Sequence, residues 1–190
     1  MTDFKKYPKV KRLGDNENAG ILSEGRITIQ EKLDGANFRF TYDREEDRVV
    51  FGSRNVEYWN EKDIDSNFQH AVDYVRETID KRALDYISRA AQGRLTFFGE
   101  AMHPHTLDYQ WEEVPSFLGF DIYSAKDESF FDWRSVERTF DTLNLKTVPI
   151  RFSGYVEDLP EAYHPGSGIE VGESEYREGK PEGIVYKNDT

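Results

Sequence analysis

Two stretches of alternating apolar and polar residues lie on either side of an Asp-Gly pair, and no other feature of the sequence constrains the fold as much. Residues 27–32 alternate as a half-buried strand does. The alternation resumes over residues 37–42, and Asp34-Gly35 between the two stretches is a strong turn signal. We therefore predict two strands that flank a turn, with Lys32 on the polar face of the first strand, beside Thr28 and Gln30.

The spacing of apolar residues changes between residues 64 and 92. There they recur every three to five positions, which predicts one long helix or two helices joined near Asp80. A shorter helix is predicted over residues 132–143, with Asp132 as its N-cap. Strands inserted between and around these helices favour an α+β fold built on antiparallel sheet. The remaining strands are predicted over residues 48–52, 95–100, 117–123, 148–152 and 183–187.

The composition excludes several classes of protein. A chain of 190 residues corresponds to about one domain, and no linker divides it, so we expect a single domain over residues 1–190. The sequence has no cysteine, which excludes a disulfide scaffold, cysteine-ligated zinc, an iron–sulfur cluster and thiol catalysis. No apolar run approaches the ~20 residues of a membrane span, and no secretory signal is visible. We therefore expect a cytoplasmic protein without a membrane partner.

The chain is strongly acidic, with 37 Asp and Glu against 25 Lys and Arg and a net charge of −12. This charge repels nucleic acid at ordinary salt, because binding relies on basic side chains that displace phosphate counterions. At ~1 M salt the Debye length is about 3 Å, so the repulsion is largely screened. The acidity therefore indicates either a high-salt source or an ordinary acidic protein. A basic cluster near the N-terminus is typical of a solvated terminus and comprises Lys5, Lys6, Lys9, Lys11 and Arg12.

The polar residues around the Asp-Gly turn are candidates for chemistry. A partly desolvated lysine beside other cations has a lowered pKa and can act as a nucleophile, which makes Lys32 a candidate. We expect Gly35 to adopt a positive φ and Asn37 to face back toward the lysine. Taken alone, Lys-x-Asp-Gly is more typical of an ordinary hairpin turn than of a catalytic site, because Asp-Gly is a common hairpin turn.

Four further segments place polar or aromatic residues at the ends of apolar strands. Residues 97–100 form an apolar run that ends in Glu100, and residues 117–123 carry Phe120, which can stack on a base. Residues 182–187 run from Glu182 to Lys187, and residues 51–54 end in Arg54. Each segment alone has a structural explanation, since Phe120 is typical of a core and Arg54 of a surface.

Taken in order, these segments resemble the motifs of the RNA ligases, a family of the covalent nucleotidyltransferases. Glu31-Lys32-Leu33-Asp34-Gly35-Ala36-Asn37 is similar to their nucleophile motif, and the four segments above resemble the motifs that follow it. The opening Phe4-Lys5-Lys6-Tyr7 is similar to the start of phage-type ligases that seal nicked duplex RNA. The resemblance implies an antiparallel-sheet nucleotidyltransferase domain, ATP-grasp-like, with inserted helices.

The resemblance also implies a role for each motif residue. Lys32 would attack the α-phosphate of ATP, expel pyrophosphate and hold AMP as a phosphoramidate, and AMP would pass to the 5′-phosphate of an RNA before a 3′-hydroxyl closes the strand. Mg²⁺, or Mn²⁺ in its place, is the expected ion because it prefers oxygen ligands. The implied partners of the nucleotide are Glu100 at the ribose hydroxyls, Phe120 stacked on adenine, Glu31 beside the base, Arg54 and Asn37 on the ribose and phosphate side, Glu182 at the metal, and Lys187 at the phosphates.

One departure from the family pattern leaves alternatives open. The family carries a further pair of phosphate-clamping lysines beyond the Glu-Gly strand, and neither these nor a C-terminal appendage is found in this sequence. We therefore expect a trimmed catalytic domain, a reduced form whose missing cations come from another chain, or a module that binds a nucleotide or an RNA end without ligating. A DNA ligase, a GTP-using capping enzyme and an acidic interaction domain are further alternatives.

Overall fold

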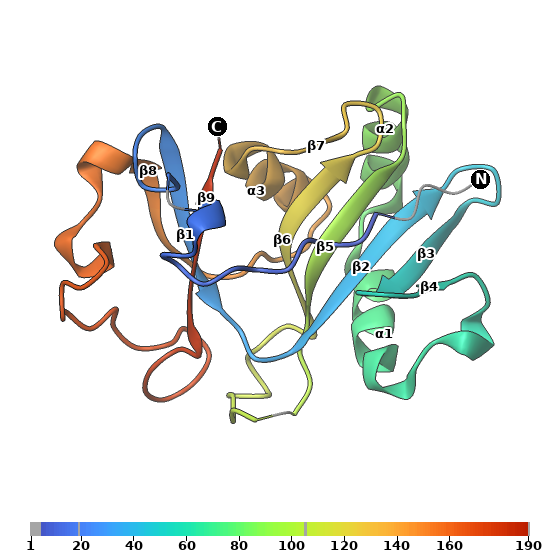
Figure 1. Cartoon of the computed structure of the whole chain (residues 1–190). Coiled ribbons are helices and arrows are strands. Elements are labelled where there is room, and N and C mark those ends of the chain that lie inside the picture. The colour runs from blue at the N-terminus through green and yellow to red at the C-terminus, as the bar shows by residue number, and fades with distance from the viewer. Residues whose placement is uncertain (1–4, 19, 105, 190) are drawn as a thin grey trace.

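The computed structural model describes residues 5–18, 20–104 and 106–189 (Figure 1). Two antiparallel sheets form the framework. The larger sheet has six strands in the order β4-β3-β2-β5-β6-β7, and the smaller has three in the order β8-β1-β9. The six strands are β2 (Ala36–Asp43), β3 (Arg48–Ser53), β4 (Glu57–Tyr58), β5 (Leu95–Ala101), β6 (Phe117–Ser124) and β7 (Ser129–Phe130). The three strands are β1 (Arg26–Lys32), β8 (Ile150–Tyr155) and β9 (Gly183–Asn188).

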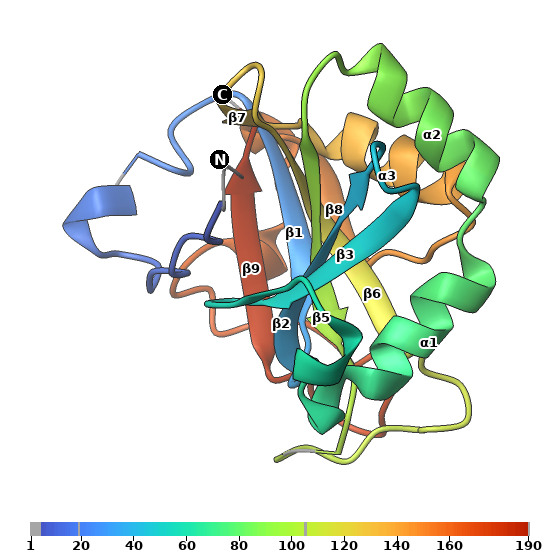
Figure 2. The same ribbon diagram turned by 90° about the vertical axis from the view of Figure 1, so that its right-hand side faces the viewer.

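Three α-helices lie on one face of the larger sheet, so that the fold is α+β as predicted (Figure 2). They are α1 (Gln69–Thr78), α2 (Lys81–Ala90) and α3 (Trp133–Thr142). The predicted helical stretch is two helices, and the joint falls at Asp80, whose side chain caps α2 by accepting from the amides of Arg82 and Ala83. Asp132 caps α3 as predicted. Short 3-10 helices cover Asn16–Asn18, Glu61–Asp63, Ser66–Phe68, Val156–Asp158 and Glu161–Tyr163.

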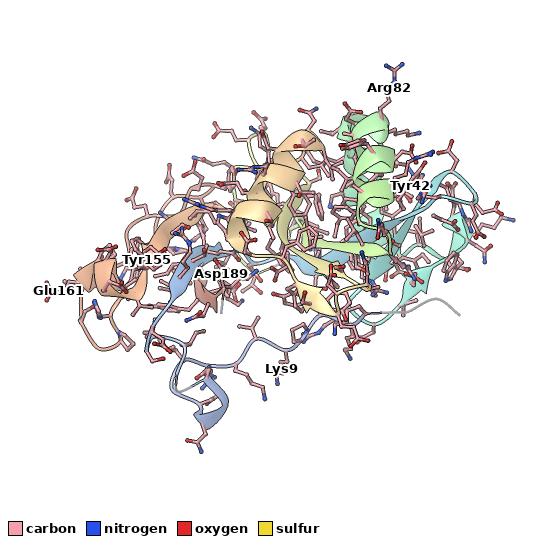
Figure 3. All side chains as sticks on the ribbon, turned by 90° about the horizontal axis from the view of Figure 1, so that it is seen from above. Lys9, Tyr42, Arg82, Tyr155, Glu161 and Asp189 are labelled. Carbon is pink, nitrogen blue, oxygen red and sulfur yellow. The ribbon has the colours of Figure 1, made fainter. Side chains whose placement is uncertain are left out.

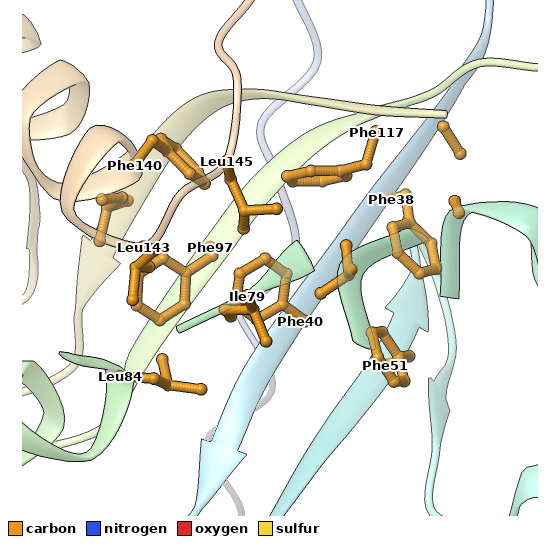
Figure 4. Close-up of a cluster of buried hydrophobic side chains, with 14 of the residues drawn as sticks. Phe38, Phe40, Phe51, Ile79, Leu84, Phe97, Phe117, Phe140, Leu143 and Leu145 are labelled. Atoms are coloured by element: carbon orange, nitrogen blue, oxygen red, sulfur yellow. The ribbon is translucent and has the colours of Figure 1, made fainter. Parts of the chain in front are cut away.

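The core lies between the larger sheet and the helices (Figure 4). Strand β2 points Phe38 and Phe40 into it, and the ring of Phe40 stacks on that of Phe97 at 4.7 Å between centroids. Because side chains alternate along a strand, Asn37 and Arg39 of β2 project from the opposite face of the same sheet. Packing of Phe38 and Phe40 in the core therefore determines that Asn37 and Arg39 lie on the sheet face opposite the helices.

The Asp34-Gly35 turn joins the two sheets and does not close a hairpin. Strand β1 pairs with β8 and β9, while β2 pairs with β3 and β5. The prediction of two strands around a turn is confirmed, but the ordinary hairpin interpretation is wrong. The reason is that the partners of β1 come from the C-terminal part of the chain, whose pairing a local pattern does not reveal.

The N-terminal segment crosses the second face of the larger sheet before it leads toward β1 (Figure 1). Arg39 donates to the carbonyl of Lys5 at 2.6 Å, and Lys5 Nζ lies 4.1 Å from the centroid of the Tyr123 ring. The solvated-terminus interpretation is therefore wrong for Lys5, although Lys6 and Lys9 are exposed. Phe4 of the opening motif lies outside the described residues. No helix in the described ranges is long and apolar enough to cross a membrane.

Candidate active site

A cavity of about 350 Å³ opens between the two sheets beneath the N-terminal segment. Its walls come from β1, β2, β5, β6 and β9, and residues 7–10 close one side. Figure 3 shows this N-terminal segment along one edge of the molecule, with Lys9 projecting from it. Seven of the eight candidate residues line the cavity, namely Glu31, Lys32, Asn37, Arg54, Glu100, Phe120 and Lys187. The eighth, Glu182, contacts Lys32. The structure therefore brings the eight residues to one region, although the side chain of Glu31 is directed away from the cavity.

Lys32 is the last residue of β1, and its ammonium donates a short hydrogen bond to Glu182. The register of β1 against β9 places Lys32 opposite Gly183, which brings the preceding Glu182 alongside the lysine. The Lys32 side chain is 42% exposed and that of Glu182 33%, so both groups remain accessible to a molecule in the cavity.

A glycine is needed at position 35 because the turn lies very close to the end of β5. The φ of Gly35 is not positive, which corrects the expectation from the sequence. A Cβ at this position would lie 2.5 Å from the carbonyl oxygen of Ala101 and 2.9 Å from Cγ of Glu100. The absence of a side chain allows the turn to lie against the end of β5, where the Gly35 amide donates to Glu100 at 3.2 Å.

The position of Glu100 at the end of β5, against the turn, changes the pKa of its carboxyl group. Burial raises its pKa to about 8, against the opposing effects of the Lys32 charge and the Gly35 amide. Burial therefore favours the protonated form of the Glu100 carboxyl over the charged form. A protonated carboxyl both donates and accepts hydrogen bonds, which suits it to contact hydroxyl groups.

Phe120 and Lys187 belong to one polar and aromatic cluster at the inner wall. Lys187 Nζ donates to the carbonyl of Phe120 at 2.8 Å and to Asp121 at 2.7 Å. The Tyr7 hydroxyl donates to the same Asp121 carboxylate at 2.6 Å, and the Tyr7 ring lies 5.0 Å from that of Phe120. Burial lowers the pKa of Lys187, while Asp121 opposes this shift. Lys187 is thus held by Asp121.

Sequence reasoning assigned no role to Asp121 or Tyr7. A carboxylate in the middle of an apolar strand was an available signal for Asp121, because an unpaired charge is rarely buried. Tyr7 belongs to the opening motif, but no local pattern indicates its partner, which lies 114 positions away in the chain.

The Glu31 carboxylate is directed elsewhere than the resemblance implied. It is fully buried and accepts hydrogen bonds from Arg151, from the Ser174 hydroxyl and from the Glu175 amide. Side chains alternate along β1, so Glu31 and Lys32 point to opposite faces. The carboxylate therefore anchors the loop before β9, and only the main chain of Glu31 is left to face the cavity.

The oxygen atoms near Glu182 determine whether a divalent metal ion could bind there. Among the described residues, no group of three or more His, Asp or Glu is placed to hold an ion. Mg²⁺ typically binds one or two carboxylates and completes its octahedron with water and substrate phosphates. A single accessible carboxylate beside Lys32 fits this pattern, provided that phosphates supply further oxygens.

The chain shares its sequence pattern with a known class of proteins. The family model described as RNA ligase matches residues 25–190. The chain therefore belongs to the RNA ligase family, and the resemblance drawn from its motifs is confirmed. A search of curated protein sequences finds no significant match.

Solved structures of an RNA ligase from Naegleria gruberi share the fold. The structure with pyrophosphate aligns with a TM-score of 0.70 at 18% identity. A mutant with ATP and Mn aligns at 0.69 and 18%, and another with AMP and Mn at 0.67 and 18%. Each alignment covers 100% of this chain and 54% of the ligase, so the chain spans about half the length of that protein.

Proposed function

We propose that this chain is the nucleotidyl-transferring part of an ATP-dependent RNA ligase, with Lys32 as the nucleophile. The observation that carries the proposal is the position of Lys32, whose amine shares one cavity with the Glu100 carboxyl and the Phe120 ring. Membership of the RNA ligase family and the nucleotides bound by the Naegleria gruberi ligase support it. A single domain over residues 1–190 and the cytoplasm as its compartment stay predictions.

In the proposed reaction the Lys32 nitrogen attacks the α-phosphorus of ATP. A nitrogen–phosphorus bond forms, the bond to the bridging oxygen breaks, and pyrophosphate leaves with that oxygen. The lysine must first lose a proton, and Glu182 is the hydrogen-bond acceptor at its Nζ. Glu182 would also hold Mg²⁺ or Mn²⁺, which when bound supplies positive charge to the phosphates.

The other cavity residues orient the nucleotide. Phe120 offers a ring for the base to stack on, and the Glu100 carboxyl can exchange hydrogen bonds with the ribose hydroxyls. The Asn37 side-chain oxygen is buried, has no hydrogen-bond partner among the described residues, and belongs to a residue that lines the same cavity. We assign Asn37 and Arg54 to the ribose and phosphate side, and Lys187 to the phosphates. The AMP group would then pass to the 5′-phosphate of an RNA, and a neighbouring 3′-hydroxyl would displace it.

Intact-protein mass spectrometry tests this function. After incubation with ATP and Mg²⁺ or Mn²⁺, the wild type should gain the mass of one AMP, and added pyrophosphate should remove it. Lys32→Arg keeps the charge without the nucleophile and should gain nothing. Lys180→Arg is a matched control, because Lys180 forms an exposed ion pair with Glu170. No adduct in wild type at either low or high salt would overturn the proposal.

A second candidate is a module that binds a nucleotide without transferring it. The hydrogen bonds from Lys187 to Asp121 and to the Phe120 carbonyl favour this alternative, because they occupy a cation expected at the phosphates. This alternative predicts that calorimetry detects binding of ATP and AMP, while mass spectrometry detects no AMP adduct. Replacing ATP by GTP in the same experiments distinguishes a capping-type enzyme.

A further inference from the structure

Gln30 places a buried side-chain amide at the cavity. It lies in the middle of β1, opposite Ile150 on one side and Val185 on the other, and only 2% of the residue is exposed. Its Nε2 is buried without a hydrogen-bond partner among the described residues. Gln30 also lines the cavity. A buried donor without a partner costs free energy, so a group that satisfies this donor would bind favourably.

The position of Gln30 relative to Lys32 indicates which part of a nucleotide reaches it. The two side chains lie on the same face of β1, two residues apart, which corresponds to about 7 Å along a strand. Phe120 and Val148 line the same cavity as Gln30. With an α-phosphate at Lys32, the ribose spans this interval and the base comes to lie near Gln30 and Phe120.

We propose that Gln30 is the residue that recognises the base, and that it selects adenine. Its amide oxygen accepts a hydrogen bond from the 6-amino group, while Nε2 donates to the adjoining ring nitrogen. Glutamine makes this bidentate pair with adenine in nucleic-acid recognition, and guanine instead presents a carbonyl oxygen at the 6-position. Phe120 supplies stacking that any base satisfies, so selectivity depends on Gln30. This inference rests on the proposed function and adds base selection to it.

The test uses calorimetric titration of the whole chain with AMP and with purine riboside 5′-monophosphate, which lacks only the 6-amino group. The wild type should bind AMP about 10-fold more tightly, because one hydrogen bond is lost and the amide oxygen is left unpaired. Gln30→Met has a similar shape without the amide and should bind both nucleotides with equal affinity. GMP should bind the wild type more weakly than AMP.

Two further variants separate recognition from a structural role. Thr28→Val removes a polar group from the same strand face outside the cavity, since Thr28 contacts Ser153. It should keep the wild-type preference for AMP. Gln30→Glu keeps the acceptor and loses the donor, so it should retain part of the preference. Without nucleotide, Gln30→Met should melt no lower than the wild type, because the substitution removes an unpaired buried donor.

The outcomes distinguish the two proposals. If the wild type binds no nucleotide, the proposed function fails. If it binds AMP and purine riboside monophosphate equally well, or if Gln30→Met keeps the wild-type preference, recognition by Gln30 is refuted while nucleotide binding stands. If Gln30→Met has a lower melting temperature than the wild type and still prefers AMP to purine riboside monophosphate, Gln30 has a structural role and does not recognise the base.

Discussion

The ion pair behind the candidate nucleophile offers a quantitative test of the structure. Glu31 precedes Lys32, and its fully buried carboxylate accepts from Arg151, whose side chain is 17% exposed. Arg151 lies on β8 and also donates to the carbonyl of Glu173 at 2.5 Å, which ties the loop before β9 to β8. Arg151→Met keeps much of the side-chain volume and removes the positive charge, so Glu31 is left as a buried charge with only neutral donors.

Removing one partner of a buried pair costs about 3–5 kcal/mol, since the remaining charge is not compensated. We expect Arg151→Met to lose this much free energy of unfolding. Two neutral donors, the Ser174 hydroxyl and the Glu175 amide, remain on the carboxylate and favour the lower end of the range. Urea denaturation followed by tryptophan fluorescence measures the loss, and an unchanged m-value would show that the two-state treatment holds.

Lys180→Ala is the matched control, because it removes an ion pair whose two side chains are 69% and 72% exposed. An exposed pair contributes about 0–1 kcal/mol. The double variant Glu31→Gln with Arg151→Met should be more stable than Arg151→Met alone, since it no longer buries a charge. The reasoning is refuted if Arg151→Met costs no more than Lys180→Ala, or if the double variant is less stable than the single one.

Three further substitutions test other contacts. Gly35→Ala should lose AMP transfer and about 1–3 kcal/mol of stability through overpacking, whereas Gly183→Ala, whose Cβ meets its nearest atom at 3.8 Å, should keep both in the mass and urea assays. Burial raises the pKa of Glu100 from 4.5 to about 8, so the stability that this raised pKa contributes is full below pH ~4.5 and is lost as the pH rises to about 8. Glu100→Gln should therefore flatten the fall of melting temperature over that interval. Tyr109→Phe removes the hydroxyl that accepts from the Asp34 amide at 2.8 Å and should cost about 1 kcal/mol in urea unfolding.

Local patterns predicted the parts of this fold that local physics determines. Alternation located the strands around the turn, Asp132 was predicted as an N-cap, and the joint was predicted near Asp80. Both side chains bond to nearby amides at a helix start. Alternation also places Glu31 on the opposite face from Lys32. The resemblance put Glu31 beside the base, and the structure follows the alternation.

Long-range pairing accounts for what the sequence did not reveal. Strand β1 finds its partners more than 100 positions away, so no window of the sequence shows that β1 and β2 belong to different sheets. The contact of Tyr7 with Asp121 depends on the same assembly. So does the burial of Gln30 Nε2, which finds no hydrogen-bond partner in the part of the chain that the structure describes. Alternation assigns Gln30 to the polar face of its strand, but it does not reveal which residues face that side, and Tyr7 lies in no strand.

The apolar residues of β9 determine on which face of the strand Lys187 lies. Ile184 and Tyr186 pack on the outer face of the small sheet with Ile27 and Ile29, so the alternation directs Lys187 into the cavity. A slip of one residue between β1 and β9 would move the two apolar side chains into the cavity and Lys187 out of it. The free energy of burying Ile184 and Tyr186 opposes this slip, whether or not a nucleotide is bound. The position of the charged group therefore follows from hydrophobic packing on the other side of the strand.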